Sequence, residues 1–246
     1  MMDWAKSRST KAWRDTIAAW EQENPLAMRD DKGMSPQMIM EAINQAYDSG
    51  VVVTDVGQHQ MWASQFLAFG PEKRFITSGG LGTMGFGFPA AIGAKIGCPD
   101  ADVVCISGDG GMQMNIQELA TAVVEEVPVT VCILNNYYLG MVRQMQQLFY
   151  GKRYSGTCLR RRKSCPADCK GPNKNCPPYE PDFVKLAESY GAHGIRVTEA
   201  SEIAPALAQA KANTDAPTII EFLIATDELV LPMVKSGNPM SEMILR

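Results

Sequence analysis

The chain has 246 residues and a mass of 26.9 kDa, the size of one α/β domain or of two small domains. Hydrophobic residues make up 46% and charged residues 20% of the sequence, a balance typical of a globular protein and not of a disordered one. Its 23 basic and 27 acidic side chains give a net charge of −4, which argues against nucleic acid as a partner because phosphate binding favours a basic surface.

Residues 1–34 are polar and helix-prone, with isolated tryptophans, and we expect them to form a helical lead-in or linker. We also expect a cytoplasmic protein, because the N-terminus lacks a signal pattern of basic and then apolar residues. Ser35 and Pro36 then predict the start of a helix and of the main domain, residues 35–246. Serine is a favoured N-cap residue, and proline fits the first helical position.

Short runs of β-branched and apolar residues predict buried strands at 51–54, 103–106, 129–134 and 219–224. Helical patterns lie between them, at 89–96, 115–124, 182–190 and 202–212. Near-continuous apolar strands that alternate with helices indicate an α/β fold with a doubly wound parallel sheet, covered by helices on both faces.

The longest uncharged run, residues 75–94, has the length of a membrane span but contains six glycines and a proline. It therefore predicts a turn-rich loop that leads into a helix, and no membrane partner is expected.

Seven cysteines fall into two groups. Cys98, Cys105 and Cys132 stand singly in apolar stretches and predict small buried thiols. Four others crowd into a basic, proline-rich segment without periodicity, where they could bind a structural zinc ion, although their spacing differs from familiar zinc motifs. Reduced thiols without a ligand, an iron–sulfur cluster and disulfides are the alternatives; the four residues are Cys158, Cys165, Cys169 and Cys176.

Three segments follow predicted strands directly, at 55–59, 108–111 and 135–136. The carboxyl ends of parallel strands meet at the edge where doubly wound sheets bind ligands. Asp109 and Asn136 offer oxygen ligands for Mg²⁺, and the glycines beside Asp109 allow backbone N–H groups to approach phosphate oxygens. A diphosphate held through Mg²⁺ fits better than a nucleotide, because the nucleotide fingerprint and the P-loop lysine are missing.

Gly108-Asp109-Gly110, followed after 24 residues by Asn135-Asn136, resembles the thiamine diphosphate motif. Residues 55–62, 76–85 and 140–144 resemble the large catalytic subunit of the acetolactate synthase (acetohydroxyacid synthase) family. The resemblance covers about 13–149 and 181–234. It implies the thiamine diphosphate-binding fold, a diphosphate-binding module, in a transferase of branched-chain amino acid biosynthesis. Such an enzyme condenses pyruvate with pyruvate or 2-ketobutyrate and releases CO2.

The resemblance also implies roles for individual residues. Asp109 and Asn136 would bind Mg²⁺ through their side chains and Tyr138 through its backbone carbonyl. The diphosphate would be held by Val56, Gly57, Gln58, His59, Gly110 and Gly111. The aminopyrimidine would be held by Gly82, Met84, Gly140 and Met141, with Met84 bending the cofactor; Gly108 and Leu139 complete the expected cofactor-binding set. No catalytic residue is assigned, because we interpret Glu118 as part of a solvated helix face and Glu221 as a residue at the end of a strand.

Two departures from the family are visible. The family commonly has a tryptophan in its second-substrate pocket where this chain has Met145, and residues of about 156–180 resemble an insertion in the loop that closes over the site.

The family's subunit has three domains, and this chain matches only the last. The resemblance therefore implies an N-terminal pyrimidine-binding domain, on the same or another chain, that supplies a catalytic glutamate, and a middle domain that holds FAD. We expect the isolated chain to be inactive and to form a homo-oligomer. The expected substrates are 2-oxo acids, and a regulatory subunit is a candidate partner. Three alternatives remain: another thiamine diphosphate 2-oxo acid decarboxylase, a subunit of a 2-oxo acid:ferredoxin oxidoreductase, and a non-catalytic binding module.

Overall fold

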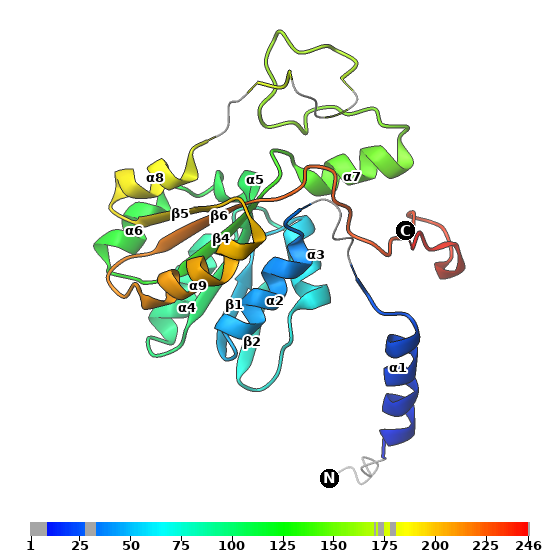
Figure 1. Ribbon diagram of the computed structural model, residues 1–246, viewed down its shortest axis with the longest axis horizontal. Helices are drawn as coiled ribbons and strands as arrows, with labels where there is room; N and C mark the ends of the chain where they lie inside the picture. Colours follow the sequence, from blue (N-terminus) through cyan, green and yellow to red (C-terminus); the bar gives the residue numbers. More distant parts are fainter. Residues whose placement is uncertain (1–8, 28–32, 170, 172–174, 178–180, 246) are drawn as a thin grey trace.

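The computed structural model describes residues 9–27, 33–169, 171, 175–177 and 181–245, and a six-stranded sheet lies at its centre (Figure 1). Trp4 and parts of the expected lead-in and insertion lie outside the described residues. The strands are β1 (Gly50–Thr54), β2 (Lys73–Thr77), β3 (Val103–Gly108), β4 (Thr130–Asn135), β5 (His193–Val197) and β6 (Thr218–Leu223). The helices are α1 (Lys11–Glu23), α2 (Pro36–Ala46), α3 (Gln58–Phe66), α4 (Gly87–Gly97), α5 (Asp109–Met112), α6 (Glu118–Val124), α7 (Gly140–Phe149), α8 (Phe183–Tyr190) and α9 (Ile203–Ala212), with the short 3-10 helices η1 (Ala200–Glu202) and η2 (Met240–Glu242).

All neighbouring strands of the sheet are parallel, in the order β2-β1-β3-β4-β6-β5. This confirms the predicted doubly wound α/β fold. The chain leaves β1 toward β2 on one side and returns to β3 on the other, so the winding direction changes at β1. In such sheets, the change of direction opens a crevice at the carboxyl ends of the strands.

Two apolar layers bury the two faces of the sheet. Along β1, Val52 points toward α2, α3 and α9, whereas Val51 and Val53 point toward α4, α6 and α8. Each large side chain buried in these layers contributes about 1.5–3 kcal/mol to stability. The layers leave the strand ends as the part of the sheet that is available for a ligand.

The four predicted strands and the four predicted helices are present, and Ser35 caps α2 by accepting a hydrogen bond from the backbone N–H of Met38. The sequence patterns missed the edge strands β2 and β5, because both carry polar residues and are only half-buried. They also missed α3 and α7, which begin within the motif segments.

Three expectations about element boundaries were wrong. Residues 75–77 complete β2 and are not part of a loop. The strand predicted at 103–106 extends through Gly108, and the short helix α5 starts at Asp109. The following helix starts at Glu118 and not near residue 115.

Helix α1 stands away from the sheet and its covering helices (Figure 1). None of its residues is buried, and Trp13 and Trp20 are 59% and 52% exposed. Their rings form a T-shaped pair with centroids 5.6 Å apart. Within the described residues, no helix is both long and apolar enough to cross a membrane.

Candidate functional site

A cavity of about 260 Å³ lies beyond the carboxyl ends of β1, β3 and β4. Its walls include every residue that the sequence predicts to bind a cofactor: Val56, Gly57, Gln58, His59, Gly82, Met84, Gly108, Asp109, Gly110, Gly111, Asn136, Tyr138, Leu139, Gly140 and Met141. Segments that lie up to 85 positions apart in the sequence, from Val56 to Met141, thus meet in one place, because the parallel strands that precede them end at the same edge.

Asp109 presents a buried carboxylate to this cavity, with only 4% of the residue exposed. Its Oδ1 atom accepts a hydrogen bond from the backbone N–H of Gly110 at 2.8 Å, whereas Oδ2 has no hydrogen-bond partner among the described residues. Burial raises the pKa of Asp109 to about 7, although the backbone N–H of Gly110 opposes the change. A buried carboxylate oxygen without a partner destabilises the fold, and a bound cation would satisfy it.

Asn136 is held beside Asp109 in a fixed orientation. Its Nδ2 donates to Oε1 of Gln58 at 3.1 Å, and its Oδ1 accepts the backbone N–H of Tyr138 at 3.1 Å. Tyr137 adopts a left-handed φ of 64°, and its N–H donates to Oδ1 of Asn135. The loop after β4 is therefore tied by two successive side-chain hydrogen bonds, and Asn136 keeps a second lone pair for a ligand.

Gln58 joins this loop to α7 and to the segment 228–230. Its Nε2 donates to Oε1 of Gln144 at 2.8 Å and to the carbonyl of Glu228 at 2.9 Å. Gln144 also exchanges two hydrogen bonds with the backbone of Val230. The sequence motif contained Gln144 but gave it no role, because its partners lie 86 residues away.

His59 is buried on the first turn of α3, and its Nε2 has no partner among the described residues. Burial lowers the pKa of His59 to about 4, while the charge of Asp55 acts in the opposite direction. The imidazole is therefore neutral at pH 7 and can make one further hydrogen bond with a ligand.

Asp55 is a site residue to which the sequence pattern assigned no function. Its buried carboxylate accepts the backbone N–H groups of Val56, Gly85 and Gly87 at 2.8, 3.1 and 2.8 Å. These contacts tie the end of β1 to the loop that carries Gly82 and Met84. An acid directly after an apolar strand, the same signal that identified Asp109, could have identified Asp55.

Two glycines permit close approaches in the walls of the cavity. A Cβ atom on Gly140 would collide with Oε1 of Gln58 and lie 2.8 Å from Nδ2 of Asn136. A Cβ atom on Gly111 would collide with Oδ1 of Asp55. Both positions therefore require glycine for the polar contacts described above.

The described part of the segment between α7 and α8 lies against the loop after β4. Leu139 N–H donates to the carbonyl of Thr157 at 2.8 Å, and Leu159 N–H donates to the carbonyl of Tyr137 at 3.0 Å. The guanidinium of Arg160 lies over the Tyr137 ring, 4.4 Å from its centroid. The insertion thus begins directly on the candidate site.

The structure does not support the predicted zinc site. All four cysteines of the insertion are described, but no three His, Cys, Asp or Glu side chains in the described residues come together as metal ligands. The thiols make separate local contacts instead: Cys165 Sγ accepts the N–H of Arg162, and Cys169 Sγ donates to the carbonyl of Gly171. For the same reason an iron–sulfur cluster is not supported, and none of the seven cysteines forms a disulfide. Cys105 and Cys132 are buried as predicted, whereas Cys98 is only half-buried.

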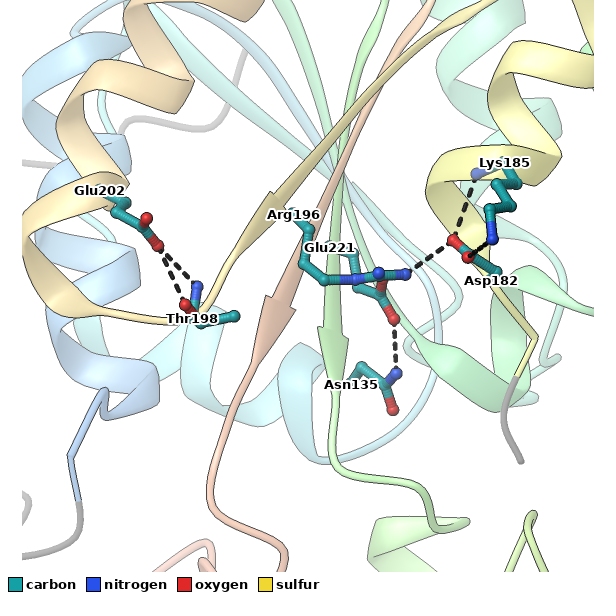
Figure 2. Close-up of polar contacts among 7 residues, drawn as sticks. All are labelled: Asn135, Asp182, Lys185, Arg196, Thr198, Glu202 and Glu221. Carbon is teal, nitrogen blue, oxygen red and sulfur yellow. Dashed lines mark hydrogen bonds and ion pairs between the residues drawn. The ribbon is translucent and has the colours of Figure 1, made fainter. Parts of the chain in front are cut away.

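Neither of the two acids interpreted as non-catalytic lines the cavity. Glu118 starts α6, where it accepts a hydrogen bond from Thr121. The interpretation of Glu221 as a strand end was wrong: it is the fourth of the six residues of β6 and is completely buried. Figure 2 shows its carboxylate between Asn135 and Arg196.

The sheet is parallel and doubly wound, and its carboxyl edge carries a glycine-lined cavity with buried polar groups. These features define a class of α/β domains, those that bind small ligands where the winding direction changes. Within that class, the chain belongs to the family of thiamine pyrophosphate enzymes, as the C-terminal TPP (thiamine diphosphate) binding domain, whose profile matches residues 55–222.

Relatives with known names agree with this assignment. The acetolactate synthase large subunits of Corynebacterium glutamicum and Cyanidium caldarium are each 41% identical, over 97% and 96% of this chain. The chain covers 36% and 37% of those relatives, so it spans little more than a third of their length. A solved structure, the thiamine diphosphate-dependent 4-hydroxybenzoylformate decarboxylase of Rhodococcus jostii RHA1, matches 83% of this chain and 35% of its own, with a TM-score of 0.68 and 27% identity. The resemblance seen in the sequence motifs is confirmed.

Proposed function

We propose that this chain is the cofactor-binding third of an acetolactate synthase, an enzyme that condenses two 2-oxo acids with loss of CO2 in branched-chain amino acid biosynthesis. The observation that most supports the proposal is the partnerless Oδ2 of Asp109, buried in a cavity that also contains the fixed amide of Asn136. The identity to named large subunits supports the choice of reaction.

In this proposal Mg²⁺ is held by the side chains of Asp109 and Asn136 and by the backbone carbonyl of Tyr138. Mg²⁺ prefers oxygen ligands and takes few of them from protein, so the diphosphate and water complete its shell. The first turn of α3, with His59, and the glycines beside Asp109 donate hydrogen bonds to the diphosphate. Thiamine diphosphate, when bound, supplies the carbon nucleophile and the electron sink that decarboxylation and carbon–carbon bond formation require.

The apolar side chains of the cavity have the complementary task. Met84, Leu139 and Met141 line it and exclude water from the bound cofactor. In the proposal, Met84 bends the cofactor across its side chain, and Gly82 and Gly140 leave room for the aminopyrimidine. Exclusion of water strengthens every electrostatic contact inside the cavity.

The rest of the enzyme is part of the proposal. A pyrimidine-binding domain, on the same or another chain, would cover the cavity and supply the acid that acts on the aminopyrimidine. FAD would bind to a middle domain, and the assembly would be a cytoplasmic homo-oligomer with a regulatory subunit as a candidate partner. The proposed domain is residues 35–246, with residues 1–34 as its lead-in and an insertion at about 156–180.

Replacement of Asp109 tests the cofactor site. The wild-type chain should bind thiamine diphosphate only in the presence of Mg²⁺, as measured by isothermal titration calorimetry, and Asp109→Ala should abolish that binding. The circular dichroism spectrum should be unchanged, because Asp109 lies at the edge of the sheet and not in its core. Glu118→Gln, which alters an acid outside the cavity, is the matched control. Metal-dependent binding that survives in Asp109→Ala would contradict the site.

A product assay tests the reaction. The chain mixed with a candidate N-terminal half, thiamine diphosphate, Mg²⁺ and FAD should convert pyruvate to acetolactate. A second candidate function, that of a thiamine diphosphate-dependent 2-oxo acid decarboxylase, is favoured by the likeness to the 4-hydroxybenzoylformate decarboxylase. Acetaldehyde as the product, without acetolactate, would select this second function.

A further inference from the structure

A buried carboxylate that lies outside the cavity is part of a chain of polar contacts that leads to it. Glu221 shares the face of β6 with the apolar side chain of Ile219 and is completely buried. Its Oε1 accepts a hydrogen bond from Nδ2 of Asn135 at 2.7 Å, and its Oε2 accepts one from Nε of Arg196 at 2.8 Å (Figure 2). Both oxygens of the carboxylate thus have partners on the two neighbouring strands, β4 and β5.

The charge of Glu221 is balanced on the side away from the cavity. Arg196 also contacts Asp182, the N-cap residue of α8, at 2.7 Å. Asp182 in turn accepts the backbone N–H of Lys185 at the start of that helix. Figure 2 shows these contacts as a continuous row from α8 across β5 and β6 to the end of β4.

On the side toward the cavity, Glu221 determines how Asn135 is oriented. Because Nδ2 of Asn135 is bonded to Glu221, its Oδ1 faces the N–H of Tyr137 and accepts a hydrogen bond at 3.0 Å. The left-handed φ of Tyr137 is unfavourable for a tyrosine and persists only where other contacts enforce it. This residue separates Asn136 from Tyr138, the two proposed Mg²⁺ ligands of the loop.

Stability alone does not explain a charged residue at this position. Replacing a buried ion pair by apolar residues of similar volume is often neutral or stabilising, and Val131, Ile133 and Ile219 on the same face of the sheet are apolar. An apolar side chain at position 221 would leave Asn135 free to turn, and the loop would lose the contact that sets its conformation. The pair therefore serves the geometry of the loop.

We propose that Glu221 is a positioning residue: with its charge balanced by Arg196, it fixes Asn135 and thereby the loop 136–138 that carries two of the three proposed Mg²⁺ ligands. The inference rests on the proposed function and concerns how its metal site is organised. Residues that orient metal ligands without touching the metal typically change metal affinity 10- to 100-fold when they are replaced.

The test compares three single variants of the full chain, and the double variant Glu221→Gln/Asn135→Ala, with the wild type. Glu221→Gln keeps the size of the side chain but can accept only one of the two hydrogen bonds. Asn135→Ala removes the link between Glu221 and the loop, and it serves as the second variant if Glu221→Gln folds poorly. Glu202→Ala is the matched control, because Glu202 also accepts backbone N–H groups, those of Thr198 and Glu199, but lies at η1 and outside the cavity.

Two measurements are made on each variant. Hydrogen exchange at the N–H groups of Tyr137 and Tyr138 reports on the loop without any cofactor. Calorimetric titration of thiamine diphosphate at several Mg²⁺ concentrations reports on the metal site. We expect Glu221→Gln and Asn135→Ala to accelerate exchange at these two amides and to raise the Mg²⁺ concentration needed for half-maximal binding about 10- to 100-fold. Glu202→Ala should leave both quantities unchanged.

The inference is overturned if exchange at Tyr137 and Tyr138 is unaltered in Glu221→Gln, or if exchange accelerates while the Mg²⁺ requirement stays that of the wild type. Additive effects in the double variant Glu221→Gln/Asn135→Ala would also overturn it, because residues that act through one another are not additive. A wild-type chain that binds no thiamine diphosphate refutes the proposed function instead, and the exchange data then decide alone whether Glu221 holds the loop.

Discussion

Asp55 offers a sharp test of how the cavity is built, because one buried side chain organises two segments of its wall. We predict that Asp55→Ala strongly destabilises the chain and that Asp55→Asn does so to a smaller extent. The carboxylate accepts backbone N–H groups of Val56, Gly85 and Gly87, and the last two lie about 30 residues away in the sequence.

The magnitudes follow from these contacts. Hydrogen bonds to charged groups contribute about 1.5–3 kcal/mol each, and a buried donor left without an acceptor costs about 1–3 kcal/mol. Asp55→Ala leaves the N–H groups of Gly85 and Gly87 without an acceptor, so we expect a loss of about 3–5 kcal/mol in the free energy of unfolding. Asp55→Asn keeps one acceptor oxygen for Gly85 but turns an NH2 group toward Gly87, which predicts a loss of about 1–3 kcal/mol.

Urea unfolding of the cofactor-free chain at pH 7, followed by circular dichroism, measures both values, and the slope with urea should not change. Asp215→Ala is the matched control, because Asp215 is exposed and forms its ion pair with His193 at the surface; its effect should be small beside that of Asp55→Ala. An Asp55→Ala loss below about 1 kcal/mol, or equal losses for the two variants, would refute this account of the wall.

Four further predictions concern the same cavity. In the cofactor-free chain with a chelator, Asp109→Asn should be more stable than the wild type at pH 8, and this advantage should vanish toward pH 4. The pKa of Asp109 is about 7 in the folded state and 3.8 ordinarily, so the wild type loses stability as the pH rises between these two values. Urea unfolding at each pH measures the difference. Gly140→Ala should weaken thiamine diphosphate binding at least tenfold by calorimetry, because the new methyl group displaces Gln58 and Asn136. In the control variant Gly93→Ala on α4, the new Cβ meets open space, so this variant should bind normally and gain about 0.5–1 kcal/mol of stability. Metal analysis should find well under one zinc ion per chain, and stoichiometric zinc would reverse our conclusion on the insertion. A thiol reagent should modify the insertion cysteines in the folded chain, but it should modify Cys105 and Cys132 only after unfolding. The pure chain alone should produce no acetolactate, because the proposed pyrimidine-binding domain would supply general acid–base assistance of about 10²–10⁴-fold and would close the cavity. Steady production by the pure chain would contradict this.

The sequence predicted the parallel sheet and the cavity together because both depend on local signals. Apolar runs such as residues 129–134 identify strands wherever both faces are buried, and in a parallel sheet the residues that follow them meet at one edge. The edge strand β2 escaped detection because Lys73 and Arg74 interrupt its apolar pattern, and only pairing with β1 makes it a strand.

Residues whose role depends on distant partners could not be predicted. Nothing near Glu221 in the sequence indicates that Arg196 and Asn135 will flank it, so its burial was missed. The cysteines of the insertion illustrate the opposite error, because closeness in the sequence suggested a metal site that their positions in space do not form.

The distribution of tryptophans gives the chain an optical reporter of its own site. Trp62 is buried in the wall of the cavity, whereas Trp13 and Trp20 stand in solvent on α1. An indole in an apolar wall emits at shorter wavelength than one in water and is protected from aqueous quenchers such as acrylamide or iodide. In a chain whose tryptophans at positions 4, 13 and 20 are replaced by phenylalanine, the remaining tryptophan fluorescence, excited at a wavelength that tyrosine does not absorb, comes from Trp62. The arrival of a ligand in the cavity can then be followed in real time without any added label.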